Sequence, residues 1–397
     1  MEEIRHITEK EKPAFMSIGN YSFGQWQYEP EEDDLAWLDT EEVLALFVDG
    51  RMAARLRNRS FTQIIRGVPK PMGGLSSVAS FPEYRRRGYI RRLMAAVFTD
   101  MEAKKQPVSA LFPFRQSFYR RFGYVNTNSY YRLKVPTTAL QHLLPLPTAE
   151  DGWTLTRIPA EEAQLQLQPF ERQMAAQHHG YVILPDDLHK EIWNFLRKDQ
   201  HLLFVEREGV LQGALRYSLK GFMDKGELTV HTMFWRDLET RDIILGFIGS
   251  HVDNAQNCWL PIPPGANERY WLGDIAPPLV AETSFMPLMV RIIDPSAAIT
   301  ELPAAREGEL IIRYTDPHLP QRDGLYRIAA EDGRLHAHPH SGAPAAQLTV
   351  DALSALVFGA APPEELRHRG WLTGEESAIQ LLAGWFPVRP VYNPNFF

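Results

Sequence analysis

The sequence is poor in cysteine and has no long apolar run. Cys258 is the only cysteine in 397 residues, so no internal disulfide can form, and we expect it to be a buried small apolar residue. No apolar run approaches the ~20 residues that span a bilayer. The first residues, MEEIRHITEKEK, are too charged for a signal peptide. These absences predict a soluble, cytoplasmic chain that does not associate with membranes.

The sequence also lacks a positive balance of charge. The 42 lysines and arginines are outnumbered by 49 aspartates and glutamates, which gives a formal net charge of −7. A nucleic-acid partner is therefore not expected, whereas a cationic ligand is weakly favoured. Hydrophobic residues make up 44% of the chain and aromatic residues 11%, which is enough for the cores of two or three domains.

Residues 78–124 are the most informative part of the sequence. Apolar residues there follow first a strand pattern that stops before Pro82 and then a helical spacing that begins after Gly88. The expected elements, in order, are a strand over 75–81, a basic turn over 85–88, a helix that includes 90–101, a strand over 108–112 and a short helix over 116–121 that carries Tyr119. This order places a basic turn directly before a helix and a tyrosine after the next strand.

The basic turn is suited to binding an anion. The first N–H groups of a helix have no partner within the helix, and they lie at the positive end of its dipole. Gly88 would let a phosphate approach the backbone, and the three arginines before it add positive charge. Three arginines alone are usually a solvated turn, and Tyr119 alone would usually be a packed aromatic. The complete order of elements instead favours a pyrophosphate site of a coenzyme A-dependent transferase.

This segment resembles the Gcn5-related N-acetyltransferase (GNAT) superfamily. Residues 85–90 match its signature Gln/Arg-x-x-Gly-x-Gly/Ala, except that Ile90 replaces the small last residue. The resemblance implies that the backbone of 78–80 binds the pantetheine arm. It also implies that Tyr119, and not Tyr124, protonates the departing thiolate. The cofactor-binding residues that it implies are Val78, Ala79, Ser80, Arg85, Arg86, Arg87, Gly88, Tyr89, Ile90, Arg91, Phe114 and Arg115.

The chain divides into three segments, which together predict an α+β (mixed α/β) fold. Residues 1–147 are expected to form the acetyl-CoA-binding GNAT domain, and the Pro-rich stretch that begins at Leu143 is interpreted as a linker. Residues 148–288 repeat the pattern of a hairpin and a helix, here over 240–254, but no basic turn precedes that helix. We therefore expect a second, degenerate GNAT fold in this segment.

The third segment, residues 289–397, resembles the sterol carrier protein type 2 (SCP2) fold. It contains two expected strands and a helix that begins after Thr349 and ends at Gly359. In isolation this resemblance suggests a lipid-binding module. A lipid- or ligand-binding protein is therefore an alternative to an enzyme. A transferase that uses another acyl-CoA, or that transfers aminoacyl groups, is a second alternative.

The order of the three segments resembles the Eis (enhanced intracellular survival) family over the whole chain. The resemblance implies an acetyl-CoA-dependent N-acetyltransferase without a metal, which forms homo-hexamers. Its substrates would be primary amines of cationic molecules such as aminoglycosides, polyamines or lysine side chains. It also implies that the terminal α-carboxylate, here that of Phe397, is the general base. An alkyl amine with a pKa near ~10.4 must lose a proton before it attacks a thioester. A carboxylate that the terminal Phe396-Phe397 pair holds in an apolar pocket can accept that proton.

Two further patterns carry weaker hypotheses. Three histidines alternate within 336–340, but Pro339 interrupts them and no acidic or cysteine ligand is close, so no metal site is expected. Acidic residues fill most of 29–34 and have aromatic neighbours. That run is interpreted as a solvated loop or as a rim that holds a polycationic substrate.

Overall fold

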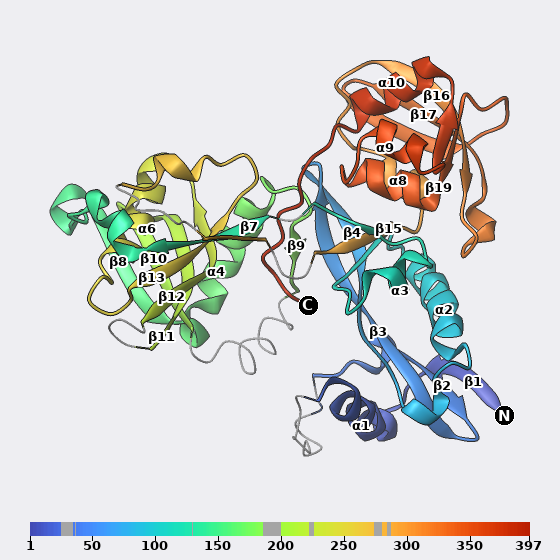
Figure 1. Cartoon of the computed structure of the whole chain (residues 1–397), viewed down its shortest axis with the longest axis horizontal. Helices are drawn as coiled ribbons and strands as arrows, with labels where there is room; N and C mark the ends of the chain where they lie inside the picture. Colours follow the sequence, from blue (N-terminus) through green and yellow to red (C-terminus); the bar gives the residue numbers. More distant parts are fainter. Residues whose placement is uncertain are drawn as a thin grey trace. The chain divides into compact units, whose positions relative to one another are not determined.

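The computed structural model describes residues 1–24, 35, 37–128, 130–185, 200–221, 226–273, 280–283 and 287–397 (Figure 1). The acidic run over 29–34 therefore lies outside the described residues. Contacts group the chain into two units: unit 1 holds Met1–Asn128, Met286–Arg389 and Phe397, and unit 2 holds Ser129–Phe285 and Pro390–Phe396. Within the described part, no helix combines the length and the apolar character needed to cross a membrane.

Unit 1 contains a sheet built from the N-terminal segment and one strand from much later in the chain. In spatial order its strands are β1 (Glu2–His6), β2 (Val43–Val48), β3 (Arg51–Ile65), β4 (Val68–Ser80), β5 (Val108–Leu111), β15 (Met289–Ile292) and β6 (Val125–Asn126). Neighbours pair antiparallel except β4 and β5, which are parallel and are connected through α2 (Tyr89–Ala103). The predicted order of strand, turn, helix and strand is confirmed.

Side chains of β2 alternate between the two faces of this sheet. The odd positions, 43, 45 and 47, pack with α1 (Lys12–Phe23), whereas Leu44 and Leu46 pack with α2. A strand covered on both faces needs this apolar run, because successive side chains point to opposite faces. The α2 side chains at 93, 94, 97, 98 and 101 are all fully buried, which confirms the helical spacing expected from the sequence.

The hairpin of β3 and β4 binds the C-terminal part of unit 1. Its turn uses Arg66 at φ 51° and Gly67 at φ 86°, both in the left-handed region that a two-residue type I′ turn requires. The Arg66 guanidinium donates to the carbonyl oxygens of Leu356 and Val357 at 2.8 and 2.9 Å. Burial lowers the pKa of Arg66 to about 10. These bonds satisfy carbonyl groups at the end of a helix, where cations are favoured.

A third sheet forms the C-terminal part of unit 1. Its strands, in spatial order, are β18 (Arg334–Pro339), β17 (Gly324–Glu331), β16 (Gly308–Thr315), β19 (Ala346–Thr349) and β20 (Leu372–Gly374). Its helices are α7 (Pro295–Ile299), α8 (Val350–Val357), α9 (Pro363–His368) and α10 (Glu376–Trp385) (Figure 1). Thr349 caps α8 by accepting a hydrogen bond from the Ala352 N–H at 3.3 Å, which confirms the predicted helix start.

Unit 2 repeats the strand order of the first sheet. Its strands, in spatial order, are β8 (Trp153–Pro159), β10 (Gln200–Arg207), β11 (Val210–Lys220), β12 (Glu227–Trp235), β13 (Asn257–Ile262), β7 (Tyr131–Pro136) and β14 (Val280–Thr283). The helix α4 (Ala160–Ala175) follows β8, and α6 (Leu238–Gly249) connects the parallel pair β12 and β13. Cys258 is fully buried in this core, as expected.

In each of the first two sheets, one strand comes from outside the segment that was predicted to form that sheet. After β5 the first sheet continues with β15, which follows the second segment in sequence. After β13 the second sheet continues with β7, which precedes the predicted boundary at 147. Each of the two sheets therefore takes a strand from outside its own segment. The division into segments at 147 and 288 stays a prediction.

Candidate functional site

The edge of β4 is open where β4 and β5 separate. The two strands pair in parallel only from Met72 to Gly74, opposite 108–110. β5 ends at Leu111, whereas β4 continues to Ser80 and keeps β3 as its partner on the other side. Among the described strands, none pairs with 78–80 on the side that faced β5. These three residues were predicted to bind the pantetheine arm, and an open strand edge can bind an extended amide chain in this way.

A buried arginine holds the bulge within this part of β4. Ser77 has φ 57°, and the register with β3 shifts between Arg55 and Arg57. Arg55 Nη1 donates to the Ser77 carbonyl oxygen at 2.7 Å, and its guanidinium lies 3.6 Å from the centre of the Phe15 ring. Burial lowers the pKa of Arg55 to about 9. Arg55 was not among the site residues predicted from the sequence, although the alternation of arginines at 55, 57 and 59 was a usable signal.

The basic turn leads from β4 into α2, as predicted. Arg85, Arg86 and Arg87 are all exposed, and Arg85 Nε donates to the Ser80 carbonyl oxygen at 3.3 Å. Arg86 and Gly88 lie in the left-handed region, at φ 62° and 80°. Gly88 is the N-cap of α2, and no side chain caps this helix start. The first N–H groups of α2 are therefore available to an anion.

Of the residues around the start of α2, some lie over the basic turn and others pack in the core. A Cβ at Gly88 would lie 3.4 Å from Arg91 Nη2, so the Arg91 side chain lies over the turn. Ile90 packs against the core cluster of the α2 face. The Tyr89 side chain is also in this core, and its hydroxyl donates to Glu2 Oε1 at 2.8 Å. Tyr89 can therefore offer only its backbone N–H to a ligand at the helix start.

The equivalent helix of unit 2 has a different start. Asp237 is the N-cap of α6, and its carboxylate accepts a hydrogen bond from the Thr240 N–H at 2.8 Å. A carboxylate already satisfies this helix end and would repel a phosphate. This arrangement agrees with the degenerate character predicted for the second fold.

Tyr119 lies on the short helix α3 (Gln116–Arg120) among aromatic rings. Its side chain is 4% exposed, and ring centres of Phe114 and Phe118 lie 5.7 and 5.1 Å from its own. Phe114 is 68% exposed, and Arg115 is the N-cap of α3. The Tyr119 hydroxyl makes no hydrogen bond with any described residue. Burial raises the pKa of Tyr119 above its ordinary value, so the hydroxyl keeps its proton at neutral pH.

Tyr124 has a different environment from Tyr119. It is completely buried, and its hydroxyl is 2.8 Å from Ser109 Oγ. Ser109 in turn donates to the Gly73 carbonyl oxygen. Burial raises the pKa of Tyr124 to about 12. A hydroxyl that is already bonded in the core is poorly placed to donate a proton to a ligand, which supports the choice of Tyr119 as the acid.

The ring of Phe397 packs where β4 and β5 separate. Its centre lies 4.7 Å from that of Phe61 on β3 and 5.2 Å from that of Phe112, which directly follows β5. A Cβ on Gly74 would lie 2.2 Å from the Phe61 ring and 3.1 Å from the Phe397 ring. Gly74 thus makes room for both rings. Phe397 was predicted from the sequence, whereas Phe61, Phe112 and Gly74 were not, although two adjacent glycines inside a strand are a signal of close approach.

Polar contacts within unit 2 hold the residues before Phe397. Asn395 Nδ2 donates to Glu171 Oε1 at 3.1 Å and to the Val182 carbonyl oxygen at 3.0 Å. Asn393 Oδ1 accepts a hydrogen bond from the Val182 N–H at 3.1 Å. Phe396 is 49% exposed. The expectation that both terminal phenylalanines lie in an apolar pocket is therefore wrong for Phe396, because its side chain is half exposed.

The described residues contain no group of three or more His, Cys, Asp or Glu side chains that could hold a metal ion. The rings of His338 and His340 lie 6.1 Å apart, and both residues are exposed on or beside β18.

Comparison with known families assigns two parts of the chain. A family model described as an acetyltransferase (GNAT) domain matches residues 3–126, and one described as a sterol carrier protein domain matches residues 295–394. The chain therefore carries a GNAT acetyltransferase domain and a sterol carrier protein domain, as predicted. GNAT domains in general use acetyl-CoA, for which the open β4 edge and the uncapped basic turn are suited.

Individual relatives agree with this assignment. An uncharacterized N-acetyltransferase of Streptomyces griseus is 29% identical over 128 residues, which are 31% of this chain and 30% of that protein, so the match spans less than a third of the curated relative. Two solved structures match over the full length of both chains. They are a GCN5-related N-acetyltransferase from Anabaena variabilis, with 19% identity and a TM-score of 0.86, and Eis1 from Mycobacterium abscessus, with 18% and 0.78. The chain thus has the fold of Eis1 over its whole length.

Proposed function

We propose that this protein is an N-acetyltransferase that moves the acetyl group of acetyl-CoA to a primary amine of a small cationic substrate. One observation carries the proposal. Where β4 and β5 separate, the first sheet presents an open strand edge next to an uncapped basic helix start, and the ring of Phe397 packs there. Aminoglycosides, polyamines and lysine side chains are the substrates that the resemblance to the Eis family suggests.

The first sheet and the start of α2 offer separate groups to the pantetheine arm and to the pyrophosphate of coenzyme A. The amides of the pantetheine arm would pair with the backbone of 78–80, as an added strand does. The pyrophosphate would accept hydrogen bonds from the first N–H groups of α2, with Arg85, Arg86 and Arg87 around it. These contacts would use backbone groups at an open strand edge and at an uncapped helix start, together with exposed cations.

The transfer requires one base and one acid. The protonated amine first gives a proton to the α-carboxylate of Phe397, directly or through a water molecule. Its nitrogen lone pair then attacks the thioester carbonyl carbon, so that a C–N bond forms and the C–S bond breaks, and the nitrogen releases its second proton to solvent as the amide forms. Tyr119 donates its hydroxyl proton to the departing thiolate. Proton exchange with solvent afterwards restores the carboxylate and the phenol.

The environment of Tyr119 supports its role as the acid. Burial raises the pKa of Tyr119, so the phenol carries a proton at neutral pH that it can donate. Its hydroxyl has no hydrogen-bond partner among the described residues and is free to approach the sulfur. A carboxylate at the other side of the reaction favours a cationic acceptor by electrostatic attraction.

The resemblance to the Eis family further supports a cytoplasmic homo-hexamer. Sedimentation of the purified protein tests the hexamer.

A coenzyme A release assay over aminoglycosides, polyamines and lysine peptides tests the proposal. Removal of Phe397 and the Tyr119→Phe variant should each lower kcat by about 100-fold or more, which is the usual contribution of an acid or base. Acetyl-CoA affinity should stay nearly unchanged in both. Phe396→Ala is the matched control, because it alters the exposed neighbour and keeps the terminal carboxylate. Unchanged turnover without Phe397 would refute the terminal base, and no coenzyme A release with any amine would refute the function.

A further inference from the structure

The end of α3 is held by two residues from much later in the chain: Arg291 on β15 of the first sheet, and His318 in the C-terminal part of unit 1. α3 has only five residues, too few for a helix that is stable by its own hydrogen bonds. Tyr119 and Arg120 have their carbonyl oxygens satisfied locally, by the N–H groups of Phe122 and Gly123 at 2.9 and 3.1 Å. The next two carbonyl groups, of Arg121 and Phe122, instead accept hydrogen bonds from side chains 197 and 169 residues later in the chain.

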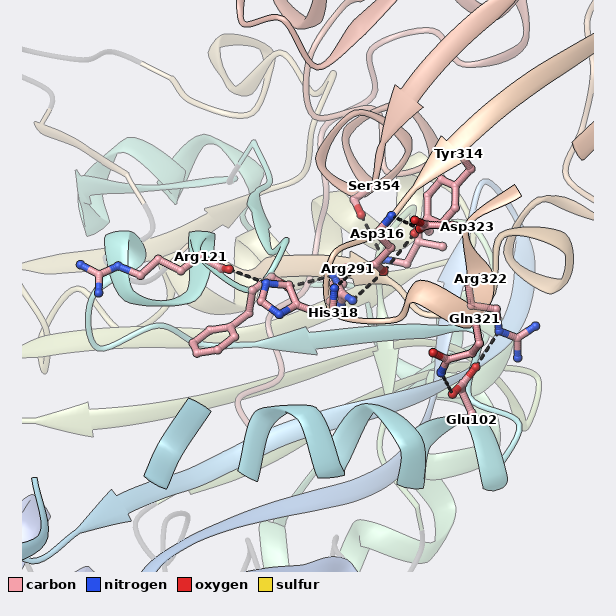
Figure 2. A network of polar contacts seen from close by, with 12 residues as sticks. Glu102, Arg121, Arg291, Tyr314, Asp316, His318, Gln321, Arg322, Asp323 and Ser354 are labelled. Carbon is pink, nitrogen blue, oxygen red and sulfur yellow. Dashed lines mark hydrogen bonds and ion pairs between the residues drawn. The ribbon is translucent and has the colours of Figure 1, made fainter. Parts of the chain in front are cut away.

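His318 binds the first of these two carbonyl groups. Its Nε2 lies 2.6 Å from the Arg121 carbonyl oxygen, so Nε2 carries the proton that is donated. Its ring also lies 5.5 Å from that of Phe122 and 6.3 Å from that of Phe98 on α2. Figure 2 shows the His318 ring directed at the end of α3. This side chain is only half-buried.

Arg291 binds the second carbonyl group from inside the core. Its Nη1 donates to the Phe122 carbonyl oxygen at 2.8 Å, and its Nη2 pairs with Asp316 at 2.7 Å, with both side chains 0% exposed. The guanidinium lies 4.2 Å from the centre of the Phe98 ring. A Cβ at Gly123, which has φ 78°, would lie 2.3 Å from Arg291 Nη1. Only glycine at 123 therefore fits this arginine.

The same C-terminal segment makes a second contact that does not involve α3. Arg322 Nε donates to Glu102 Oε1 at 2.6 Å, and Gln321 Nε2 donates to Glu102 Oε2 at the same distance. Glu102 is near the end of α2, and Figure 2 shows it apart from Arg121, which follows α3. The segment therefore touches two helices of the acetyltransferase domain through separate residues, and these residues can be altered one at a time.

We propose that His318 and Arg291 are positioning residues that hold α3, and with it Tyr119, in the place where the acid is needed. This inference rests on the proposed function of Tyr119. Through His318, the sterol-carrier-like part of unit 1 then supports catalysis by holding the helix that carries the acid, while Arg291 holds it from β15 of the first sheet. A displaced acid loses turnover but leaves the coenzyme A contacts of β4 and α2 in place.

Four proteins test this inference: the wild type, His318→Ala, His318→Gln and Arg322→Gln. We expect His318→Ala to lower kcat about tenfold with little change in the KM for acetyl-CoA. Glutamine at 318 can still donate an N–H to the Arg121 carbonyl and should restore most of the loss. Arg322→Gln loosens the same segment without touching α3 and should keep kcat close to the wild-type value.

Amide hydrogen exchange of residues 118–124 provides a readout that does not depend on activity. Exchange there should accelerate in His318→Ala and stay unchanged in His318→Gln and Arg322→Gln. Equal effects of His318→Ala and Arg322→Gln on kcat and on exchange would overturn the inference, as would unaltered kcat in His318→Ala. If the wild type transfers no acetyl group, the proposed function fails, and the exchange measurement still decides whether His318 holds α3.

Discussion

Gly73 and Gly74 are adjacent on β4, and their replacement by alanine tests the placement of Phe397. A Cβ at Gly74 would lie 2.2 Å from a Phe61 ring carbon, whereas carbon atoms in contact are ordinarily ~3.5 Å apart or more. The Phe61 ring would therefore have to move by roughly 1.3 Å. Because its centre is 4.7 Å from that of Phe397, the terminal ring would have to move with it.

Gly73→Ala is a matched control for this change. Its Cβ would be 2.7–2.9 Å from Asn58, Met101 and Gln106, which lie on the other face of β4. Both variants insert one methyl group into a packed site, which costs about 1–3 kcal/mol of stability. Only Gly74→Ala is directed at Phe397, and a misplacement of ~1 Å in a catalytic group costs on the order of 100-fold in rate.

Steady-state kinetics together with urea unfolding separates the two effects. We expect both variants to unfold at lower urea concentration than the wild type. Gly74→Ala should lose about 100-fold in kcat, while Gly73→Ala should stay within about threefold. Equal losses of kcat in the two variants, or a wild-type kcat in Gly74→Ala, would show that the position of Phe397 does not matter for turnover.

Two further predictions concern stability and reactivity. Gly123→Ala should destabilise unit 1 by several kcal/mol, since its methyl group displaces the buried Arg291, and losing such a pair costs about 3–5 kcal/mol. Gly67 also has a positive φ, but a Cβ there would meet nothing within 4 Å, so Gly67→Ala should lower the free energy of unfolding by only about 1–2 kcal/mol. Equal urea midpoints for the two variants would contradict this account. Burial raises the pKa of the Cys258 thiol to about 12, so iodoacetamide at pH 8 should label it only after unfolding; rapid labelling of the native protein would contradict the burial.

The local elements of the site could be predicted from the sequence. Apolar spacing identified α2, and Gly88 and Thr349 marked the starts of α2 and α8. These signals are readable because a helix start or a turn depends on residues within a few positions of each other. The basic turn and Tyr119 were recognised for the same reason, since the whole motif lies within 50 residues.

Only the tertiary structure decided what surrounds those elements. The insertion of β15 beside β5, the contact of Arg291 with Gly123 and the packing of Phe397 against Gly74 each join residues more than 150 positions apart. Periodicity and capping carry no information on such pairs, because they describe one element at a time. The sequence by itself thus determined a helix start suited to an anion and a candidate acid. The packing of distant segments decided which face of β4 receives the end of the chain and what surrounds α3, the helix that carries Tyr119.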